Sequence, residues 1–516
     1  MLWGGSRVYA RLGVCREECG TGKRKNKGLA HGLEGVNHKS NKNCKEVYGK
    51  YSNYIWRMQS AGMEYLESRL MFGMVPGLES TRALCDALGN PEKKFRSIHV
   101  VGTNGKGSTS YYLAGVLQAH GLKTGLYVSP HLVSLQERIR IDDVPIPVGD
   151  LDRLLLKVKS AAESVSAGRV AAGMPPVEPT FFEVLTLVAF LHYAEQGVDV
   201  AVLEAGMGGR LDSTAVAGGE IAVVTSIGLE HTEVLGPTES AILREKMGVL
   251  GVPGESSGEA ISGQKTFIVG GISGALLEEA REYATTLGCK CVVPEIREDI
   301  VLPNLGHHYI ENASLSLAAA AQFIQESAPF KTAAHFAHEE YDDALAIKTL
   351  ATRSWAGRMQ LLAGSDGKTR VILDGAHNSH AVRRLVETLR TYYPGKKFHC
   401  LFGALKDKDV GEMLKLMAPH VACWHITKTP YPRFRELADL RGEMQALGLL
   451  VSSEGELSRE YLNKVLAACD ADKLSDSPLL ITGSLYMIGA SIELLKEDFD
   501  ELAFFRELEP TTNEHR

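Results

Sequence analysis

The sequence contains no run of about 18 consecutive apolar residues, the length that a membrane-spanning helix requires. It also lacks an apolar signal-peptide segment near its start. Its 9 cysteines are odd in number and scattered, and none of them forms paired motifs at zinc-finger spacing. These absences exclude an integral membrane protein, and they favour free thiols in a reducing compartment, which we expect to be the cytoplasm.

Acidic residues outnumber basic residues over most of the chain. The first 60 residues hold 12 Lys and Arg against four acids, whereas the remaining residues carry a net charge of −15. An acidic body offers no wide basic face to phosphates, so nucleic acid is excluded as the main partner. We expect residues 1–60 to form a flexible basic extension. The alternative is a leader that directs the protein to a mitochondrion or plastid.

Beyond this extension, short apolar runs alternate with helical patterns, and the length of the chain suits two or three domains. The first series predicts strands at 97–101, 124–128, 198–203 and 221–226 and helices at 109–120 and 181–193. The second series predicts strands at 371–373, 398–402, 421–427 and 479–482 and a helix at 379–393. Residues 251–264 have loop composition. Residues 327–353 show no clear period, and we expect the domain junction within this second range. This alternation is typical of α/β domains with parallel sheets covered by helices.

A glycine-rich segment lies between the first predicted strand and the first predicted helix. It consists of Gly102, Thr103, Asn104, Gly105, Lys106, Gly107 and Ser108. Backbone N–H groups and a helix N-terminus can hold a polyphosphate there, while Lys106 reaches its terminal oxygens. The general P-loop pattern differs, because Val100 occupies the place of its first glycine and Gly107 follows the lysine. The segment predicts an ATP-binding loop.

This loop and several further blocks resemble the Mur ligase superfamily, specifically its folylpolyglutamate synthase/dihydrofolate synthase branch. The blocks are HVVGTNGKGST, GLYVSPHL with ERIRI, PTFFE, LEAGMGGRLDST, SIGLEHTEVLG, REKMGVL, LGHHYIENA, WAGRM, ILDGAHN and FGALKDKD. They extend from about residue 64 to about residue 490. The resemblance implies an α/β protein with a P-loop Mur-ligase-like ATP-binding domain at 61–340. A smaller Rossmann-like glutamate ligase domain at 353–500 and a tail at 501–516 are expected to follow.

The resemblance also implies a magnesium site beside the ATP loop. Ser129, Glu204 and His231 follow predicted strands at the edge that carries the loop, and the resemblance assigns Mg²⁺ to them. Taken singly, each could be an ordinary surface or packed side chain. Lys246 is implied to be carbamylated by CO₂ and to bind a second Mg²⁺, and a monovalent cation is a further expected cofactor. Because carbamylation needs a neutral amine, we expect a lowered pKa for Lys246, with Arg244 as the neighbouring positive charge.

Three later blocks match nucleotide-contacting segments of the family. Their residues are Asn312, Arg358, Asp374, His377 and Asn378. Arg358 can supply positive charge to a transferring phosphoryl group, and Asp374 can accept hydrogen bonds from ribose hydroxyls or hold water. Two positions depart from the family pattern: Ala356 replaces the usual proline of a PGR turn, and His308 replaces the usual Gln or Asn.

The pterin end of the acceptor is expected along PTFFE and the segment after GGR, as the resemblance implies for bacterial-type enzymes. These residues are Thr180, Phe181, Phe182, Glu183, Leu211, Asp212 and Ser213. Phe181 and Phe182 can stack on a flat heterocycle, and ordinary aromatic residues of a helix core are the equal alternative. Arg138 and Arg140 alternate, so in an extended segment they share one face. Two interpretations stay open: the arginines attract a carboxylate-rich substrate, or they keep an exposed edge strand soluble.

We therefore predict an ADP-forming ligase that adds L-glutamate to dihydropteroate or folyl-(poly)glutamates through an acyl phosphate, with Lys106, Lys246 and His377 as catalytic groups. GGRLD and FGALKDKD resemble bacterial-type members, which favours a bifunctional enzyme over a single activity. SPHL, GGRLD and FGALKDKD disfavour a muramyl-peptide ligase, and a non-catalytic nucleotide-binding protein has no use for a second metal site. We expect a monomer whose partners are ATP, Mg²⁺, L-glutamate and a pteroate or folate.

Overall fold

The computed structural model describes residues 60–70, 77–252, 265–326, 340–472 and 477–508. Of the two units into which the chain divides, all of these residues belong to the second, residues 50–516. The expected basic extension and most of the 251–264 loop lie outside the described residues, as does the end of the expected tail. In the part that is described, no helix is long and apolar enough to cross a membrane.

The first sheet has the strand order β4-β3-β2-β5-β1-β6-β7-β8. Its strands are β1 (Arg96–Val101), β2 (Thr124–Tyr127), β3 (Ile139–Ile141), β4 (Val144–Pro145), β5 (Val200–Glu204), β6 (Ile221–Val224), β7 (Thr266–Val269) and β8 (Lys290–Val292). Strands β2, β5, β1, β6, β7 and β8 run parallel. The edge pairs β2–β3 and β3–β4 are antiparallel, so the sheet is mixed rather than wholly parallel.

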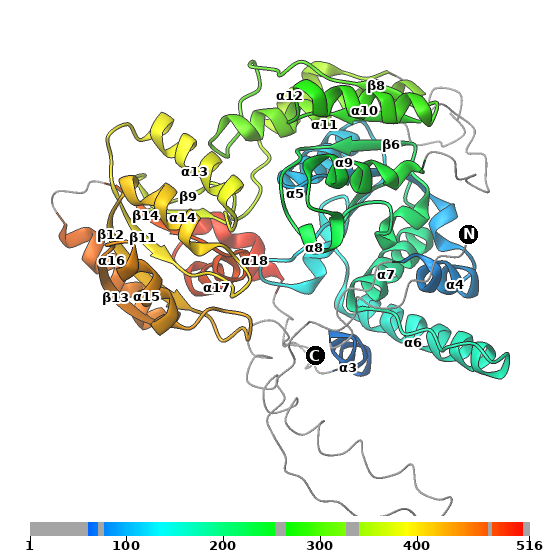
Figure 1. Ribbon diagram of the computed structural model, residues 1–516, viewed down its shortest axis with the longest axis horizontal. Helices are drawn as coiled ribbons and strands as arrows, with labels where there is room; N and C mark the ends of the chain where they lie inside the picture. Colours follow the sequence, from blue (N-terminus) through cyan, green and yellow to red (C-terminus); the bar gives the residue numbers. More distant parts are fainter. Residues whose placement is uncertain (1–59, 71–76, 253–264, 327–339, 473–476, 509–516) are drawn as a thin grey trace, which may run out of the picture. The chain divides into compact units, whose positions relative to one another are not determined.

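Helices cover both faces of this sheet (Figure 1). They are α3 (Ala61–Ser68), α4 (Glu79–Ala87), α5 (Lys106–Ala119), α6 (Val148–Ala171), α7 (Phe181–Gln196), α8 (Thr232–Leu235), α9 (Glu239–Met247), α10 (Gly274–Thr286), α11 (His307–Glu326) and α12 (Asp343–Leu350). Alternate residues of β5 show the two faces: Ala201 and Leu203 pack with α3, α4, α6 and α7, whereas Val200 and Val202 pack with α5, α11 and α12. A strand buried on both faces is apolar throughout, which explains the continuous apolar runs of the sequence.

The second sheet has the order β13-β12-β11-β14-β10-β9. Its strands are β9 (Gln360–Ala363), β10 (Thr369–Asp374), β11 (Phe398–Phe402), β12 (Val421–Lys428), β13 (Val451–Glu456) and β14 (Leu479–Thr482). Its helices are α13 (Ser379–Tyr392), α14 (Val410–Met417), α15 (Leu437–Ala446), α16 (Arg459–Ala471), α17 (Leu485–Leu495) and α18 (Ala503–Glu507). Only the edge strand β9 pairs antiparallel among its described strands. The predicted α/β class is confirmed for both halves of the chain.

One predicted helix boundary is wrong, and a segment without a clear period contains a helix. The helix expected from Thr109 begins at Lys106, because Gly105 at φ 87° turns the chain and the ATP loop runs directly into the first helical turn. The segment that showed no clear period contains α12, whose Ala346 and Leu350 are fully buried against α5 and α11. This short helix is defined by its packing and by the Asp342 side chain, which caps it by accepting from the Leu345 N–H.

Candidate active site

The ATP loop predicted from the sequence is held by contacts that only glycine allows. Gly105 has φ 87°, and a Cβ atom there would lie 2.5 Å from Asn312 Oδ1. Gly102 has φ 150°, and its Cβ would lie 1.9 Å from Thr225 Oγ1. The loop therefore packs so closely on β6 and α11 that its N–H groups stay at the start of α5, where the helix dipole favours an anion.

Lys106 opens α5 and folds back over the loop. Its Nζ donates to the carbonyl oxygens of Gly102, at 2.9 Å, and Thr103, at 3.2 Å. An ammonium group in this position adds its charge to the N–H groups of the helix start. The arrangement is suited to holding the terminal phosphates of a nucleotide.

A cavity of about 470 Å³ opens beside this loop. Most of the expected site residues line it: Thr103, Asn104, Gly105, Lys106, Gly107, Ser108, Ser129, Thr180, Phe182, Glu183, Glu204, Leu211, Asp212, Ser213, His231, Arg358 and His377. The expected residues that do not line it are Gly102, Phe181, Lys246, Asn312, Asp374 and Asn378. Side chains from both halves of the chain thus meet at one space.

Glu204 and Ser129 lie together at the carboxyl edge of the first sheet. Glu204 is the last residue of β5 and is buried, and its Oε2 accepts from the Ser129 N–H at 2.9 Å. Burial raises the pKa of Glu204 to about 6, although Lys106 opposes the shift. A buried carboxylate beside a hydroxyl is a hard oxygen donor set whose charge a divalent cation would stabilise, so these residues fit Mg²⁺.

His231 reaches the cavity by a different route from the one expected. It does not end a strand, because β6 stops at Val224 and His231 caps α8 in the left-handed conformation, at φ 47°. The side chain lines the cavity but is exposed. Its position is therefore set by the loop that follows β6.

Lys246 lies on α9 in the wall behind the cavity. It is 1% exposed, and its Nζ donates to the Gly102 carbonyl at 2.7 Å and to Glu230 Oε1 at 2.8 Å. Burial, reinforced by the nearby Lys106 charge, lowers the pKa of Lys246 to about 8. The expected neighbour Arg244 is wrong, because its exposed side chain pairs with Glu279 at 2.6 Å.

Glu230 is a site residue that the sequence reasoning missed. It lines the cavity and forms the ion pair with Lys246. Burial alone would raise the pKa of Glu230, but Lys106 and Lys246 hold it below its ordinary value. Glu230 directly precedes His231 in the quoted SIGLEHTEVLG block. The motif therefore marked this segment, but it did not show that Glu230 pairs with Lys246.

From the second sheet, Arg358 and His377 reach the cavity. His377 Nδ1 donates to the Gly375 carbonyl at 2.8 Å, so the lone pair of the neutral ring is on Nε2. Burial lowers the pKa of His377 to about 4, with Arg358 adding to the shift. Asp374 ends β10, and its carboxylate accepts from Met359 N–H at 2.9 Å. It therefore holds the turn that carries Arg358.

The ATP loop also touches the start of α13 directly. Asn104 Nδ2 lies 2.8 Å from His380 Nδ1, and Asn378 Nδ2 donates to Asn104 Oδ1 at 3.3 Å. Asn378 caps α13 at the same time, because its Oδ1 accepts from the Ala381 N–H. These contacts place the first residues of α13 against the loop.

The PTFFE segment starts helix α7 and also contributes residues to the cavity wall. Thr180 and Glu183 form a reciprocal capping box at the start of α7, in which the Thr180 N–H donates to Glu183 Oε2 at 2.8 Å and the Glu183 N–H donates to Thr180 Oγ1 at 3.3 Å. Phe182 lines the cavity and packs on Gly206, where a Cβ would lie 2.7 Å from its ring. Phe181 does not line it and instead lies under the Arg138 guanidinium, 5.5 Å from the ring centre.

Hydrogen bonds of buried side chains fix the conformation of the segment that follows GGR. Asp212 is buried and accepts from the Met207 and Thr214 N–H groups, at 3.0 and 3.1 Å. The Ser213 hydroxyl lies 2.8 Å from Thr186 Oγ1. Asp212 and Ser213 both line the cavity, so these hydrogen bonds fix part of its wall.

Arg138 and Arg140 lie in different elements. Arg138 ends a 3-10 turn, whereas Arg140 lies in β3. Both are buried, which removes the solubility interpretation. Arg138 lines the main cavity. Arg140 lines a second cavity of about 290 Å³, and Ser129 and Glu204 line both cavities.

Other charged residues of the cavity come from the second half of the chain. They are Asp407, Lys408 and Arg433, together with the aromatic Tyr486. Arg433 pairs with Asp407 at 3.1 Å. Asp407 and Lys408 belong to the quoted FGALKDKD block, whereas no sequence signal marked Arg433.

Comparison with known proteins agrees with this geometry. The family model of the Mur ligase glutamate ligase domain matches residues 357–484. The Bacillus subtilis dihydrofolate synthase/folylpolyglutamate synthase is 31% identical over 456 residues, covering 84% of this chain and 98% of the relative.

Two solved structures are similar throughout. The Escherichia coli FolC complex with DHPP and ADP has a TM-score of 0.67 at 26% identity, over 84% of this chain and 97% of that one. The Yersinia pestis bifunctional folylpolyglutamate synthase/dihydrofolate synthase, in complex with AMPPNP and Mn ion, has a TM-score of 0.66 at 26% identity. Here 84% of this chain and 97% of that chain are covered.

Proposed function

Because this chain belongs to the folylpolyglutamate synthase/dihydrofolate synthase family of ATP-dependent glutamate ligases, we propose that it carries both activities of the family. In this proposal it adds L-glutamate to dihydropteroate and to folyl-(poly)glutamates. The Bacillus subtilis relative is named for both activities, and the Yersinia pestis structure is that of a bifunctional enzyme, which supports the proposal.

One observation is central to the proposed ligase reaction: Lys106, Glu204 and Phe182 line a single cavity. We propose that Lys106 and the N–H groups of the loop hold the phosphates of ATP, while Phe182 stacks on the pterin. Ser129, Glu204 and His231 would hold Mg²⁺, which neutralises phosphate charge when bound. The acceptor carboxylate would then lie between the nucleotide and the glutamate.

In the first step, an oxygen of the acceptor carboxylate forms a bond to the γ-phosphorus of ATP, and the bond from that phosphorus to ADP breaks. Arg358 and Lys106 stabilise the negative charge on the transferring phosphoryl group. The product is an acyl phosphate. Closure of the cavity by residues from both halves of the chain limits its hydrolysis by water.

In the second step, the amine of L-glutamate attacks the acyl carbon, and inorganic phosphate leaves as the amide bond forms. We propose that the proton lost by the amine passes to His377 Nε2, because the ring is neutral at physiological pH and its Nδ1 is already bonded. Lys408 and Arg433 supply positive charge for the carboxylates of the incoming glutamate.

Carbamylation of Lys246 is part of the proposal. The lowered pKa supports it, because more of the amine is neutral than in an ordinary lysine. The Glu230 ion pair opposes it, since it favours the ammonium form. An anionic carbamate beside Glu230 therefore needs a cation between them, which fits a second Mg²⁺ site.

The proposal is tested by ADP release from purified protein with ATP, Mg²⁺ and L-glutamate. Dihydropteroate and tetrahydrofolate are supplied as acceptors in separate reactions. Glutamate-dependent ADP with both acceptors is the expected result. ADP release with one acceptor alone would reduce the proposal to a single activity, and none with either would contradict it.

We also propose the domain limits 61–340 and 353–500 and a monomeric enzyme in the cytoplasm. Residue 350 ends α12, which packs on α5 and α11, and residue 357 begins the family match. These observations support a junction near the start of the second domain and extend the first domain from 340 to the end of α12. Limited proteolysis that cuts first outside residues 340–356 would argue against these limits. Sedimentation and cell fractionation test the other two points.

A further inference from the structure

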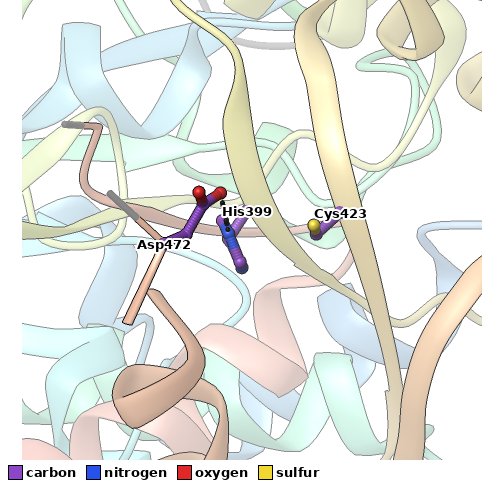
Figure 2. A group of neighbouring side chains, drawn as sticks. All are labelled: His399, Cys423 and Asp472. Carbon is purple, nitrogen blue, oxygen red and sulfur yellow. Dashed lines mark hydrogen bonds and ion pairs between the residues drawn. The ribbon is translucent and has the colours of Figure 1, made fainter. Parts of the chain in front are cut away.

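Three side chains that the proposed reaction does not use meet on one face of the second sheet. His399 of β11, Cys423 of β12 and Asp472, which directly follows α16, offer ligand atoms that all lie within 4.8 Å of one another (Figure 2). His399 is buried, and the other two are half-buried. His399 Nε2 lies 3.1 Å from Asp472 Oδ2.

An irregularity in strand pairing brings two of these residues together, and a second one lies beside them. Between Phe398 and His399 the register with β12 shifts by one residue, so that His399 pairs with Cys423. Without this shift Cys423 would point to the opposite face, because side chains alternate along a strand. The register of β12 with β13 shifts in the same way, and His425 then pairs with Ser453. Bulges of this kind re-aim side chains and are common beside functional sites.

A chain of hydrogen bonds links this cluster to Tyr461. With the Tyr461 hydroxyl donating to the Ile426 carbonyl at 3.1 Å, it accepts from the Ser453 hydroxyl, 3.0 Å away. In this direction of the chain, the Ser453 hydrogen is used and Ser453 Oγ accepts from His425 Nδ1, at 2.8 Å.

The same reasoning continues to the cluster itself. If both imidazoles are neutral, His425 Nε2 carries a lone pair and accepts from His399 Nδ1, 3.1 Å away. The His399 lone pair then lies on Nε2, which faces the Asp472 carboxylate. In this arrangement of tautomers two acceptors face each other 3.1 Å apart, and a cation at this point would stabilise both.

We propose that a zinc ion supplies this charge, bound by His399 Nε2, Cys423 Sγ and a carboxylate oxygen of Asp472. Imidazole, thiolate and carboxylate together are a donor set typical of Zn²⁺, and the sulfur disfavours Mg²⁺. Binding releases the thiol proton of Cys423 to solvent. Three protein ligands leave a fourth tetrahedral position for water.

The hydrogen bond from His399 Nδ1 to His425 gives the site the support that metal-bound histidines need, because it fixes the ring and its tautomer. The ion would join β11 and β12 to the end of α16. Its role would be to stabilise the second domain, and it is separate from the nucleotide cavity, none of whose lining residues belongs to it.

Cobalt substitution tests this assignment in the full-length chain, prepared without a histidine tag, stripped with chelator and kept in excess Mg²⁺. We expect a thiolate-to-cobalt charge-transfer band that saturates at one equivalent in the unaltered protein and in the Cys291→Ser control. Cys291 is a free, half-buried thiol on β8 of the other sheet. In Cys423→Ser the band should be lost while the circular dichroism stays unchanged.

Because other cysteines lie outside the described residues, the readout is the difference between the unaltered protein and Cys423→Ser. His425→Gln should weaken cobalt binding by about 10- to 100-fold through loss of the supporting hydrogen bond. Zn²⁺ should raise the midpoint of thermal unfolding of the unaltered protein and not of Cys423→Ser. A band of equal size in both proteins, or no band in either, would overturn the proposal and leave a proton as the charge between His399 and Asp472.

Discussion

Lys246 Nζ lies 2.8 Å from Glu230 Oε1, and the same nitrogen donates to the Gly102 carbonyl at 2.7 Å. One ammonium group thus joins the wall of the cavity to the first residue of the ATP loop. A change in the charge of Lys246 alters both contacts at once, because modification of the amine changes the hydrogen bond to Glu230 and the hydrogen bond to Gly102. The first two predictions test this relationship.

Lys246→Ala should lower glutamate-dependent ADP release by about 10³-fold or more, because it removes the amine that the proposed carbamate needs and the bonds that join Glu230 to the Gly102 carbonyl. Circular dichroism should remain that of the unaltered protein. Lys265→Ala is the control, since Lys265 is a half-buried lysine that donates only to the Leu250 carbonyl among the bonds described. Turnover near that of the unaltered enzyme in Lys246→Ala would remove this residue from the mechanism.

Glu230→Gln should lower the pKa of Lys246 below about 8, because the carboxylate favours the ammonium form. More of the amine is then neutral at a given pH, so more should react with CO₂. The measurement is the carbamate carbon signal of protein in ¹³C-labelled bicarbonate, by NMR. If the signal is absent from both the unaltered protein and the variant, Lys246 is not carbamylated.

Phe182→Ala should raise KM for dihydropteroate by about tenfold, the value of one aromatic stacking contact of about 1.4 kcal/mol, while KM for ATP stays constant. Phe181→Ala is the matched control, because Phe181 packs under Arg138 and does not line the cavity. Equal effects of the two substitutions would show that both phenylalanines serve only the core of α7.

Gly105→Ala should lower the free energy of unfolding by about 1–2 kcal/mol, because φ 87° is strained for any residue with a Cβ. The added atom would also press on Asn312, 2.5 Å away. Gly107→Ala should change stability little, since its nearest contact would be an ordinary 3.4 Å to Trp355. Urea denaturation of both variants gives the comparison.

Acid should destabilise the protein in part through His99. Burial, with a smaller effect of Lys265, lowers the pKa of His99 to about 3, whereas in the unfolded chain it is about 6.5. The unfolded state therefore binds the extra proton between these values, so this contribution is complete above pH 6.5 and is lost as the pH falls towards 3.

His99→Gln tests the size of this contribution. The amide keeps an acceptor for the Gly219 N–H, which His99 Nε2 accepts at 3.1 Å, but it does not titrate. Between pH 7 and pH 5, the free energy of unfolding of the unaltered protein should fall by about 2 kcal/mol more than that of the variant. Parallel pH profiles in urea denaturation would mean that His99 is not the group responsible.

The sequence was sufficient for those features that depend on neighbours along the chain. Alternating apolar runs predicted β5 and β11 because a strand buried on both faces must be apolar along its whole length. The Gly102–Ser108 segment predicted a turn between strand and helix because its glycines suit backbone that no other residue adopts easily, although the helix begins inside the segment at Lys106. Glu204 and Asp374 were correctly expected at strand ends for the same local reason.

The tertiary structure alone decided which distant side chains meet. Glu230 pairs with Lys246 across 16 positions of sequence, and Arg433 joins the cavity from a loop with no motif of its own. A one-residue bulge between β11 and β12 brings Cys423 to His399, and no periodicity in either strand reveals it. Local sequence determines the conformation of each segment, but register and packing are settled by the burial of whole elements against one another, and those determine the chemistry of the site.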